Sequence, residues 1–452
     1  MNKVLRFFYI LALFGFLASC GEDPNIGEEI LDDELRANIE KASPTGRIDF
    51  FKLPESDDFV NIPQDPNNPL TSEKVELGRL LFHETGLATE AKLENGMYTY
   101  SCASCHHVNA GFQAGLRQGI GEGGIGFGIR GEGRFMSSDY AEEDLDVQPM
   151  RSPSALNVAY QKVMLWSGKF GAKGVNQGTE AFWVPGTPVE NNNLNFEGVE
   201  TQALAGLTVH RLKLDIEEIA VQSTYKESFD QAFPYLDENQ RYNNQNTALA
   251  IAAYERTLLA NQAPFQKWLS GNLDAMNEAE KRGANLFFGK ANCVSCHTGP
   301  ALSTVGTVKF YALGMNDLIG SDVIQSNPAA ADHLGRGGFT QVPEDMYKFK
   351  VPQLYNMKDS PFYGHGGSFT SIEEVVRYKN HAIAENPDVS EALLAQEFIP
   401  LDLTNEEIAD LTSFLEEALY DSDLTRYVPS NLPSALCFPN NDPDSQQELG
   451  CQ

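Results

Sequence analysis

Two Cys-x-x-Cys-His motifs constrain this chain more than any other feature of its sequence. Their residues are Cys102, Cys105 and His106, and Cys293, Cys296 and His297. Each motif places two thiols and an imidazole on one short turn, where the thiols can bond to the vinyl groups of a haem and the imidazole can bind its iron. A zinc site with cysteine ligands alone would need neither histidine. The pair therefore predicts two covalently bound haem c groups, with His106 and His297 as the iron ligands.

The N-terminus has the pattern of an export signal. Lys3 and Arg6 precede an apolar run at residues 7–16, which suits the core of a signal peptide and is too short to span a bilayer. The run ends in Leu-Ala-Ser before Cys20, a pattern typical of bacterial lipoproteins, whose cysteine is acylated after cleavage. We expect a lipoprotein signal peptide at residues 1–19 and a lipid on Cys20. An ordinary signal peptide with a chance cysteine is the alternative.

The residues after Cys20 bear on location. Residues 21–29 are acidic and contain glycine and proline, so we expect a tether within an N-terminal extension that spans residues 20–68. The residue after Cys20 is Gly21 and not an aspartate, which favours the outer membrane. The acidic tether could also direct the chain to the cell surface. The prediction is an exported lipoprotein on the periplasmic side, held to the membrane only by its lipid.

The formal net charge of -30 limits the partners. A strongly acidic surface repels nucleic acid and anionic lipid headgroups, so we expect neither as a partner. The charge favours a basic or neutral protein instead. The sequence does not indicate an oligomeric state.

Cys437 and Cys451 are the cysteines that haem attachment and acylation leave unassigned among the seven of the chain. They lie in a tail rich in proline, asparagine and serine, residues 426–452. In an oxidising compartment we expect them to form a disulfide. Two free thiols are the alternative.

Helical patterns dominate the rest of the chain. Residues 76–82 and 280–288 each present leucine and phenylalanine shortly before a haem motif, a weak internal repeat that suggests two related haem domains. Residues 248–259 and 408–419 also have apolar side chains three and four apart, and Thr404 with Glu407 forms a capping box. Strand-like alternation is scarce, and the glycine-rich residues 119–133 predict an irregular loop. The expected fold is mainly α with long irregular loops.

The reactivity of each haem depends on its distal side. The eight histidines are His83, His106, His107, His210, His297, His333, His365 and His381. None lies between residues 108 and 209, so no sequence-near histidine closes the distal side of the first haem. An iron with an open position can bind peroxide, oxygen or another small ligand.

The second haem has a candidate distal ligand on a predicted helix. Ser371 and Glu374 form a capping box at its start. One face of the helix then carries Ile372, Val375, Val376 and Lys379. A lysine on an apolar face is unfavourable unless its amine is compensated, either by binding iron or by reaching solvent or a haem propionate. Tyr378 is the rival ligand if the helix phase differs by one residue.

From about residue 69 to residue 420 the chain resembles the bacterial di-haem cytochrome c peroxidases and their relatives. The matches lie in order at residues 77–82, 101–106, 151–157, 165–169, 200–203, 255–258, 292–300, 351–356, 365–368 and 371–376. The resemblance implies two cytochrome-c-like haem domains. The N-terminal domain, residues 69–265, would react with peroxide, and the C-terminal domain, residues 266–425, would receive and pass on electrons.

The resemblance also implies roles for single residues. Trp166 matches a tryptophan between the haems, where it could carry an electron, although core packing is the commoner role of a lone tryptophan. Gln202 matches a family glutamine and is the second candidate catalytic residue. An ungapped match places Lys379 where the peroxidases have the distal methionine of the C-terminal haem.

Three departures from the family pattern are informative. The peroxidases place a switchable distal histidine after the first motif; this chain has none there, which is similar to the methylamine-utilisation di-haem enzymes that oxidise a partner protein. Leu212 stands where the family has its active-site glutamate, and Glu197, Glu200 or His210 could substitute. The family binds calcium between its domains through an asparagine, and Arg151 at that position disfavours calcium.

The leading hypothesis is therefore an enzyme of the cytochrome c peroxidase type. It would reduce hydrogen peroxide to water with electrons from a small donor, a cytochrome c or a copper protein. One alternative is an oxidase that modifies a side chain of a partner protein. Another is a lipid-anchored electron carrier without enzymatic activity.

Overall fold

The computed structural model describes residues 24–217, 219, 224–304, 306–324 and 330–451. The predicted signal peptide, Cys20 and the start of the predicted tether lie outside these residues. Helices dominate and the strands are few and short, which confirms the mainly α prediction. Among the described residues no helix combines the length and the apolar character needed to cross a membrane.

The bounds of the elements are as follows. The α-helices are α1 (Pro24–Ala42), α2 (Ser72–His83), α3 (Gly198–Val209), α5 (Tyr225–Ala232), α6 (Glu238–Arg241), α7 (Asn244–Thr257), α8 (Pro264–Leu269), α9 (Glu278–Phe288), α10 (Ala330–His333), α11 (Gly335–Thr340), α12 (Ile372–His381), α13 (Asn405–Ser413) and α14 (Pro443–Leu449). A π-helical turn, Phe414–Ala418, continues α13. The strands β1 (Gly124–Ile125) and β2 (Phe135–Met136) pair antiparallel, as do β3 (Phe310–Tyr311) and β4 (Phe349–Lys350).

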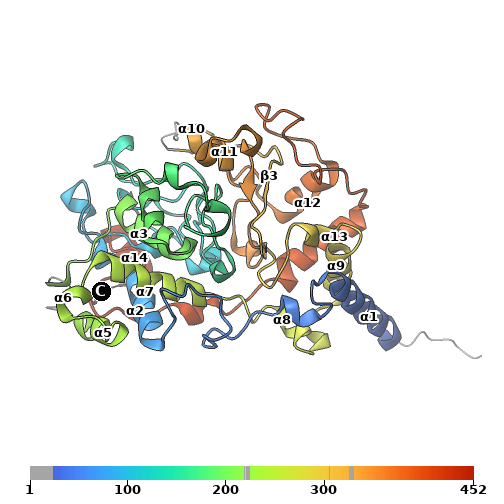
Figure 1. Cartoon of the computed structure of the whole chain (residues 1–452), viewed down its shortest axis with the longest axis horizontal. Coiled ribbons are helices and arrows are strands. Elements are labelled where there is room, and N and C mark those ends of the chain that lie inside the picture. Colours follow the sequence, from blue (N-terminus) through green and yellow to red (C-terminus); the bar gives the residue numbers. More distant parts are fainter. Residues whose placement is uncertain (1–23, 218, 220–223, 305, 325–329, 452) are drawn as a thin grey trace, which may run out of the picture.

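Two hydrophobic cores form around the helices that precede the haem motifs. α2 packs against α7, and α7 against α3, in the first core. α9 packs against α13 and α1 in the second, which also contains Phe51 and Ile62 from the N-terminal extension. Figure 1 shows α2, α3 and α7 on one side of the molecule and α1, α9 and α13 on the other. The division into haem domains at residues 69–265 and 266–425 stays a prediction.

A glycine makes the close helix contact in each core. A Cβ atom at Gly78 of α2 would collide with the backbone carbonyl of Ala250 in α7. A Cβ atom at Gly283 of α9 would likewise collide with the carbonyl of Asp410 in α13. Only glycine allows the two backbones to approach this closely. The two helices that the sequence relates as a weak repeat therefore also pack in the same way.

The predicted tether is wrong from Pro24 onward, because α1 begins there. Proline is tolerated in the first turn of a helix, so it does not oppose this start. Tertiary contacts hold the helix: Leu35 and Ile39 are fully buried in the second core. Asp32 of α1 accepts hydrogen bonds from Nε1 of Trp268 at 2.7 Å and from Nζ of Lys281 at 2.9 Å. The composition of residues 21–29 could not reveal this docking.

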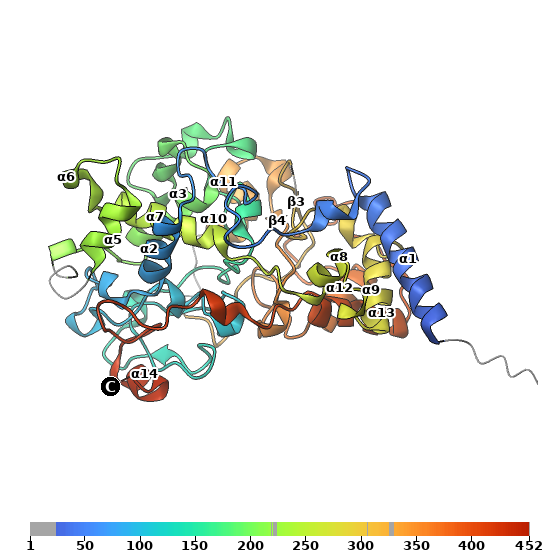
Figure 2. The same ribbon diagram turned by 90° about the horizontal axis from the view of Figure 1, so that it is seen from below.

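The structure confirms several local predictions. Capping boxes begin α12 at Ser371 and α13 at Thr404. The tail disulfide links Cys437 to Cys451 across a Cα–Cα distance of 5.8 Å. The glycine-rich residues 119–133 form a loop whose only regular element is the short strand β1. Figure 2 shows the C-terminal segment returning to the side of α2 and α7, where α14 lies.

Candidate functional site

Both Cys-x-x-Cys-His motifs fold into the same tight turn. The segments Cys102–Ser104 and Cys293–Ser295 are single 3-10 turns, and none of the four motif cysteines forms a disulfide. The backbone N–H of His106 donates to the carbonyl of Cys102, and that of His297 donates to the carbonyl of Cys293, each at 3.0 Å. The turn thus presents two thiols and an imidazole together, which is the donor set that covalent haem attachment needs.

Backbone carbonyls orient both imidazoles. Nδ1 of His106 donates to the carbonyl of Phe112 at 3.2 Å, and Nδ1 of His297 donates to that of Leu302 at 2.9 Å. Because a carbonyl only accepts, Nδ1 carries the proton and Nε2 is left to bind iron. Burial lowers the pKa of each ring to about 4, so both are neutral near neutral pH and can act as ligands.

Each motif lines a cavity. The first cavity contains Cys102, Cys105 and His106 in its wall, and the second contains Cys293, Cys296 and His297. Trp166 lines both cavities. Its Nε1 donates to the carbonyl of Arg151 at 2.8 Å, and its ring meets His365 edge-on with centroids 6.3 Å apart. The indole therefore lies between the two candidate haem sites.

The wall of the first cavity contains Gln202 on α3 and His210 directly after that helix. Nδ1 of His210 lies 2.8 Å from Oδ2 of Asp146, which also lines the cavity. Burial opposes a charge on the ring, but the carboxylate outweighs it, so the pKa of His210 is raised. The pair can hold a proton at the edge of the cavity.

Of the candidate acids, only His210 lies on this wall. Glu197 and Glu200 point elsewhere, because both carboxylates meet the guanidinium of Arg256, at 3.4 Å and 2.6 Å. Leu212 lines the cavity, as an apolar residue at the family's glutamate position. The missing acid is thus not replaced by either neighbouring glutamate.

Sequence reasoning missed Glu255 as a candidate site residue. It lines the first cavity from α7 and is 8% exposed, and its Oε2 has no hydrogen-bond partner within the described part of the chain. Burial and the charge of Glu200 raise the pKa of Glu255 to about 8, so it is protonated near neutral pH. The sequence could have indicated Glu255, because it lies four residues after Ile251 and so shares the inner face of the helix predicted at residues 248–259.

Lys379 and Tyr378, the two candidate ligands of the second haem, differ in their surroundings. Lys379 lines the cavity, whereas the hydroxyl of Tyr378 donates to the carbonyl of Leu313 and its ring packs on Phe369. Burial lowers the pKa of Lys379 to about 8, which makes the neutral amine more accessible. Lys379 thus has the position that an iron ligand would need.

Lys350 of β4 is a second lysine on the wall of this cavity, and the sequence did not mark it. It is 7% exposed, and its Nζ donates to the amide oxygen of Gln161. Burial lowers its pKa to about 8. Its backbone N–H donates to the carbonyl of Trp166 at 2.7 Å, which ties β4 to the tryptophan between the cavities.

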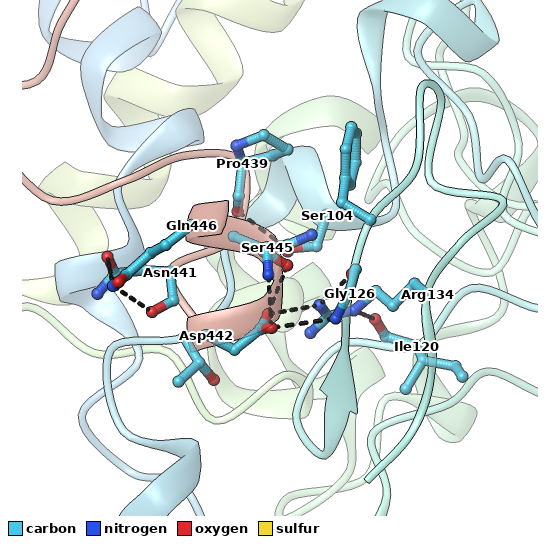
Figure 3. A network of polar contacts seen from close by, with 12 residues as sticks. Ser104, Ile120, Gly126, Arg134, Pro439, Asn441, Asp442, Ser445 and Gln446 are labelled. Carbon is cyan, nitrogen blue, oxygen red and sulfur yellow. Dashed lines mark hydrogen bonds and ion pairs between the residues drawn. The ribbon is translucent and has the colours of Figure 1, made fainter. Parts of the chain in front are cut away.

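The C-terminal tail braces the first haem loop. The hydroxyls of Ser101 and Ser104 donate to the carbonyl of Pro439 at 2.9 Å and 3.1 Å. Asp442 accepts from the backbone N–H of Gly126 at 3.0 Å and forms an ion pair with Arg134 at 3.2 Å (Figure 3). The tail thus holds both the Cys-x-x-Cys-His turn and the glycine-rich loop.

Comparison with known proteins gives consistent matches. Residues 72–274 match the model of a family described as di-haem cytochrome c peroxidase. Methylamine utilization protein MauG of Methylorubrum extorquens is 28% identical over 368 residues, which are 81% of this chain and 82% of the relative. Cytochrome-c peroxidase IdrP1 of Denitromonas iodatirespirans is 27% identical over 81% of this chain and 86% of the relative.

A more distant relative and a solved structure agree with these matches. Cytochrome c peroxidase Ccp of Escherichia coli is 25% identical over 85% of this chain and 67% of its own length. The crystal structure of a MauG-like protein associated with microbial copper homeostasis aligns with a TM-score of 0.55 and 24% identity. The alignment covers 82% of this chain and 95% of that protein, and it shows that the two share a fold.

Proposed function

We propose that the chain is a member of the di-haem cytochrome c peroxidase family, whose model matches residues 72–274, and that with two covalently bound haem c groups it reduces hydrogen peroxide to water in the first cavity. Two electrons and two protons convert one peroxide molecule to two water molecules. A haem bound through His106 would supply the iron that takes up peroxide. The observation that carries the proposal is the polar wall of that cavity, formed by Gln202 and the His210–Asp146 pair.

The wall residues have distinct roles in this proposal. The Gln202 amide can donate to and accept from a peroxide oxygen and so orient it. Asp146 fixes His210 through Nδ1, which leaves Nε2 to give a proton to the leaving oxygen. The carboxyl group of Glu255, whose buried Oε2 has no hydrogen-bond partner among the described residues, is a further proton source in the same cavity.

Electrons would enter at the second cavity from a small cytochrome c or copper protein. The net charge of -30 supports a donor with a basic docking surface. Trp166 lines both cavities, which supports a route from the second haem to the first through its indole. Lys379 would close the second iron and leave it suited to electron transfer.

Steady-state peroxide consumption with a reduced cytochrome c donor tests the proposal. We expect turnover by the wild type and a loss of about 10²-fold in kcat for His210→Gln, the usual scale for removal of a general acid. His381→Gln is the matched control, because His381 is exposed on α12 and lines neither cavity. Absence of turnover by the wild type, in both the reduced and the oxidised protein, would exclude peroxide reduction.

Oxidation of a partner protein's side chain is the second candidate function. The segment from residue 108 to residue 209 contains no histidine, so it supplies no imidazole to close the first iron. One relative is named a methylamine utilization protein. In this second proposal, the first cavity would oxidise a side chain of a partner protein with the same haem. Mass spectrometry of a protein encoded beside this gene, after exposure to the enzyme and peroxide, would show added oxygen or a cross-link.

A pure electron carrier predicts a different spectrum. Both irons would be six-coordinate and low-spin in the ferric protein, whereas an open first site gives a high-spin signal. Electron paramagnetic resonance of the oxidised protein therefore separates the carrier from both enzymatic functions.

We further propose that the mature chain is an exported lipoprotein that faces the periplasm or the cell surface. The pattern at residues 7–20 supports this location. Mass spectrometry of the N-terminal peptide would detect acylated Cys20, and Cys20→Ser would release the protein from membranes. Protease treatment of intact cells then distinguishes the cell surface from the periplasm.

A further inference from the structure

Arg151 is a buried cation at the junction of the two haem sites. Its side chain lines both cavities, and the residue is 2% exposed. No carboxylate of the described residues lies within ion-pair distance of its guanidinium. A buried charge without an acidic partner is unfavourable unless dipoles around it compensate the lost water. We therefore expect hydrogen-bond acceptors around the guanidinium of Arg151 that stabilise its charge.

Oxygen atoms from two distant segments surround the guanidinium. Nη1 donates to the carbonyl of Leu116 at 2.6 Å, and Nη2 donates to the carbonyl of Ala114 at 2.9 Å. Nη2 also donates to the hydroxyl of Ser360 at 2.9 Å, and the guanidinium carbon lies 5.6 Å from the ring centre of Phe362. One segment follows the first haem motif and the other follows β4. The guanidinium thus joins the surroundings of the two haems.

The backbone of Arg151 extends this junction. Its carbonyl accepts the hydrogen bond from Nε1 of Trp166 at 2.8 Å. Its N–H donates to the carbonyl of His365 at 3.0 Å, and His365 lines the second cavity. A displacement of Arg151 would therefore move the tryptophan between the cavities.

Carbonyl and hydroxyl oxygens are also the ligands that a hard cation such as Ca²⁺ prefers. Here these oxygens are already occupied by guanidinium hydrogen bonds, and the fixed positive charge would repel a divalent ion. The described residues also contain no group of three His, Cys, Asp or Glu side chains that could hold a metal ion. A calcium ion at the position where the resembled family binds one therefore does not fit this site, in line with the doubt that Arg151 raised from the sequence.

We propose that Arg151 is a built-in cation that takes the place of an exchangeable metal ion between the two haem sites and positions Trp166. The residue is a positioning residue, because it acts through the indole and the surrounding loops. This inference rests on the two haems and their junction, and it holds whether the protein reduces peroxide, oxidises a protein or carries electrons.

The first test uses the wild-type holoprotein. We expect that EGTA treatment and the addition of CaCl₂ leave the midpoint potentials of both haems unchanged, and that calorimetry detects no Ca²⁺ binding. Stoichiometric Ca²⁺ binding, or potentials that shift when EGTA is added, would overturn the proposal. Neither readout depends on catalytic turnover.

The second test removes the guanidinium. Because a buried positive charge favours the reduced state of a nearby haem, Arg151→Ala should lower the midpoint potential of at least one haem. Added guanidinium ion should restore the potential, since it can occupy the vacated oxygen cluster. Unchanged potentials in Arg151→Ala, or a lowered potential that guanidinium does not restore, would overturn the proposal.

Arg336→Ala is the matched control. Arg336 is also buried and donates to backbone carbonyls, at 3.1 Å to Gly168 among others, but it lines neither cavity. An equal shift in this variant would show a general effect of losing a buried arginine and would refute the specific role. If Arg151→Ala does not fold, Arg151→Lys decides: wild-type potentials with the charge retained support the proposal, and a lowered potential refutes it.

Discussion

Buried ionisable side chains distinguish the two cavities. The first contains the carboxyl group of Glu255, and the second contains the amines of Lys350 and Lys379. Burial favours the neutral form of each group, because charge is poorly solvated there. The acid therefore keeps its proton to a higher pH than a surface glutamate, and the lysines lose theirs at a lower pH than surface lysines. Such perturbed groups in a cavity are typical of functional sites.

The shift of Glu255 predicts a pH dependence of stability. Its pKa is raised from 4.5 to about 8, so the folded chain holds a proton that the unfolded chain releases. The free energy of unfolding then falls as the pH rises from about 4.5 to about 8. Glu255→Gln cannot ionise, so we expect it to gain stability relative to the wild type across this window, by up to about 1.4 kcal/mol per pH unit.

Denaturant unfolding, followed by circular dichroism at several pH values between about 5 and about 8, measures this difference. A difference between variant and wild type that stays constant with pH would contradict the shift. Glu197→Gln is a useful comparison, because the Glu197 carboxylate is paired with Arg256 in the folded chain.

Lys379 also leads to a spectroscopic prediction. If its amine binds the second iron, Lys379→Met replaces a nitrogen ligand by a thioether, which raises the midpoint potential of that haem. Tyr378→Phe is the control, because the Tyr378 hydroxyl is engaged by the Leu313 carbonyl. Redox titration followed by visible and near-infrared spectra reports both variants. A ligand change in Tyr378→Phe, with none in Lys379→Met, would reverse the assignment.

At the scale of elements, the tail is the clearest case of a segment that supports a distant site. The disulfide between Cys437 and Cys451 closes the segment that contains Pro439 and Asp442. Glu448 of α14 also accepts from the backbone N–H of Phe127 at 2.6 Å. These contacts all reach the first haem loop or the glycine-rich loop, and none reaches the second haem turn.

Replacement of both tail cysteines by serine should therefore act mainly on the first haem. A disulfide that closes a loop of about 15 residues contributes roughly 3 kcal/mol by restricting the unfolded chain. We expect earlier proteolytic cleavage in the tail and a changed absorption spectrum or potential of the first haem. Equal effects on the two haems would show that the tail stabilises the whole molecule and has no special relation to the first site.

At the scale of the whole molecule, the Trp166 segment connects the parts that carry the two haems. The Trp166 carbonyl accepts from Lys350 in β4, and its indole donates to Arg151. The tryptophan is therefore held from both sides, by residues that also line the second cavity. This arrangement favours a fixed distance between the two haems and the indole.

Trp166→Phe should slow electron transfer between the haems while both haems stay attached. Rapid-mixing absorption spectroscopy after reduction of the second haem would measure that rate. Trp183→Phe is the matched control, because the side chain of Trp183 is buried, its Nε1 donates to Thr179 at 3.1 Å, and it lines neither cavity. A Trp166→Phe rate equal to that of the control would leave packing as the role of the indole.

The sequence by itself determined what depends on neighbouring residues. Cys-x-x-Cys-His needs only one turn to bring its thiols and imidazole together, so both haem sites were predictable. The capping boxes at Ser371 and Thr404 act within a single helix turn, and the helix phase put Lys379 on the apolar face, which lines the second cavity. The tail disulfide followed from the number of cysteines and the expected compartment.

Only the tertiary structure decided what depends on contacts between distant segments. Ion pairs with Arg256 hold the carboxylates of Glu197 and Glu200 outside the first cavity. Glu255 lines that cavity, and its Oε2 has no hydrogen-bond partner among the described residues. The composition of residues 21–29 is typical of a tether, but the chain forms α1 from Pro24, and Asp32 of this helix binds Trp268 and Lys281. Arg151 becomes a junction because its guanidinium donates both to the carbonyls of Ala114 and Leu116 and to the hydroxyl of Ser360, which is far from them in the chain. Burial and pairing of charges are set by such convergence, and no local pattern of residues encodes it.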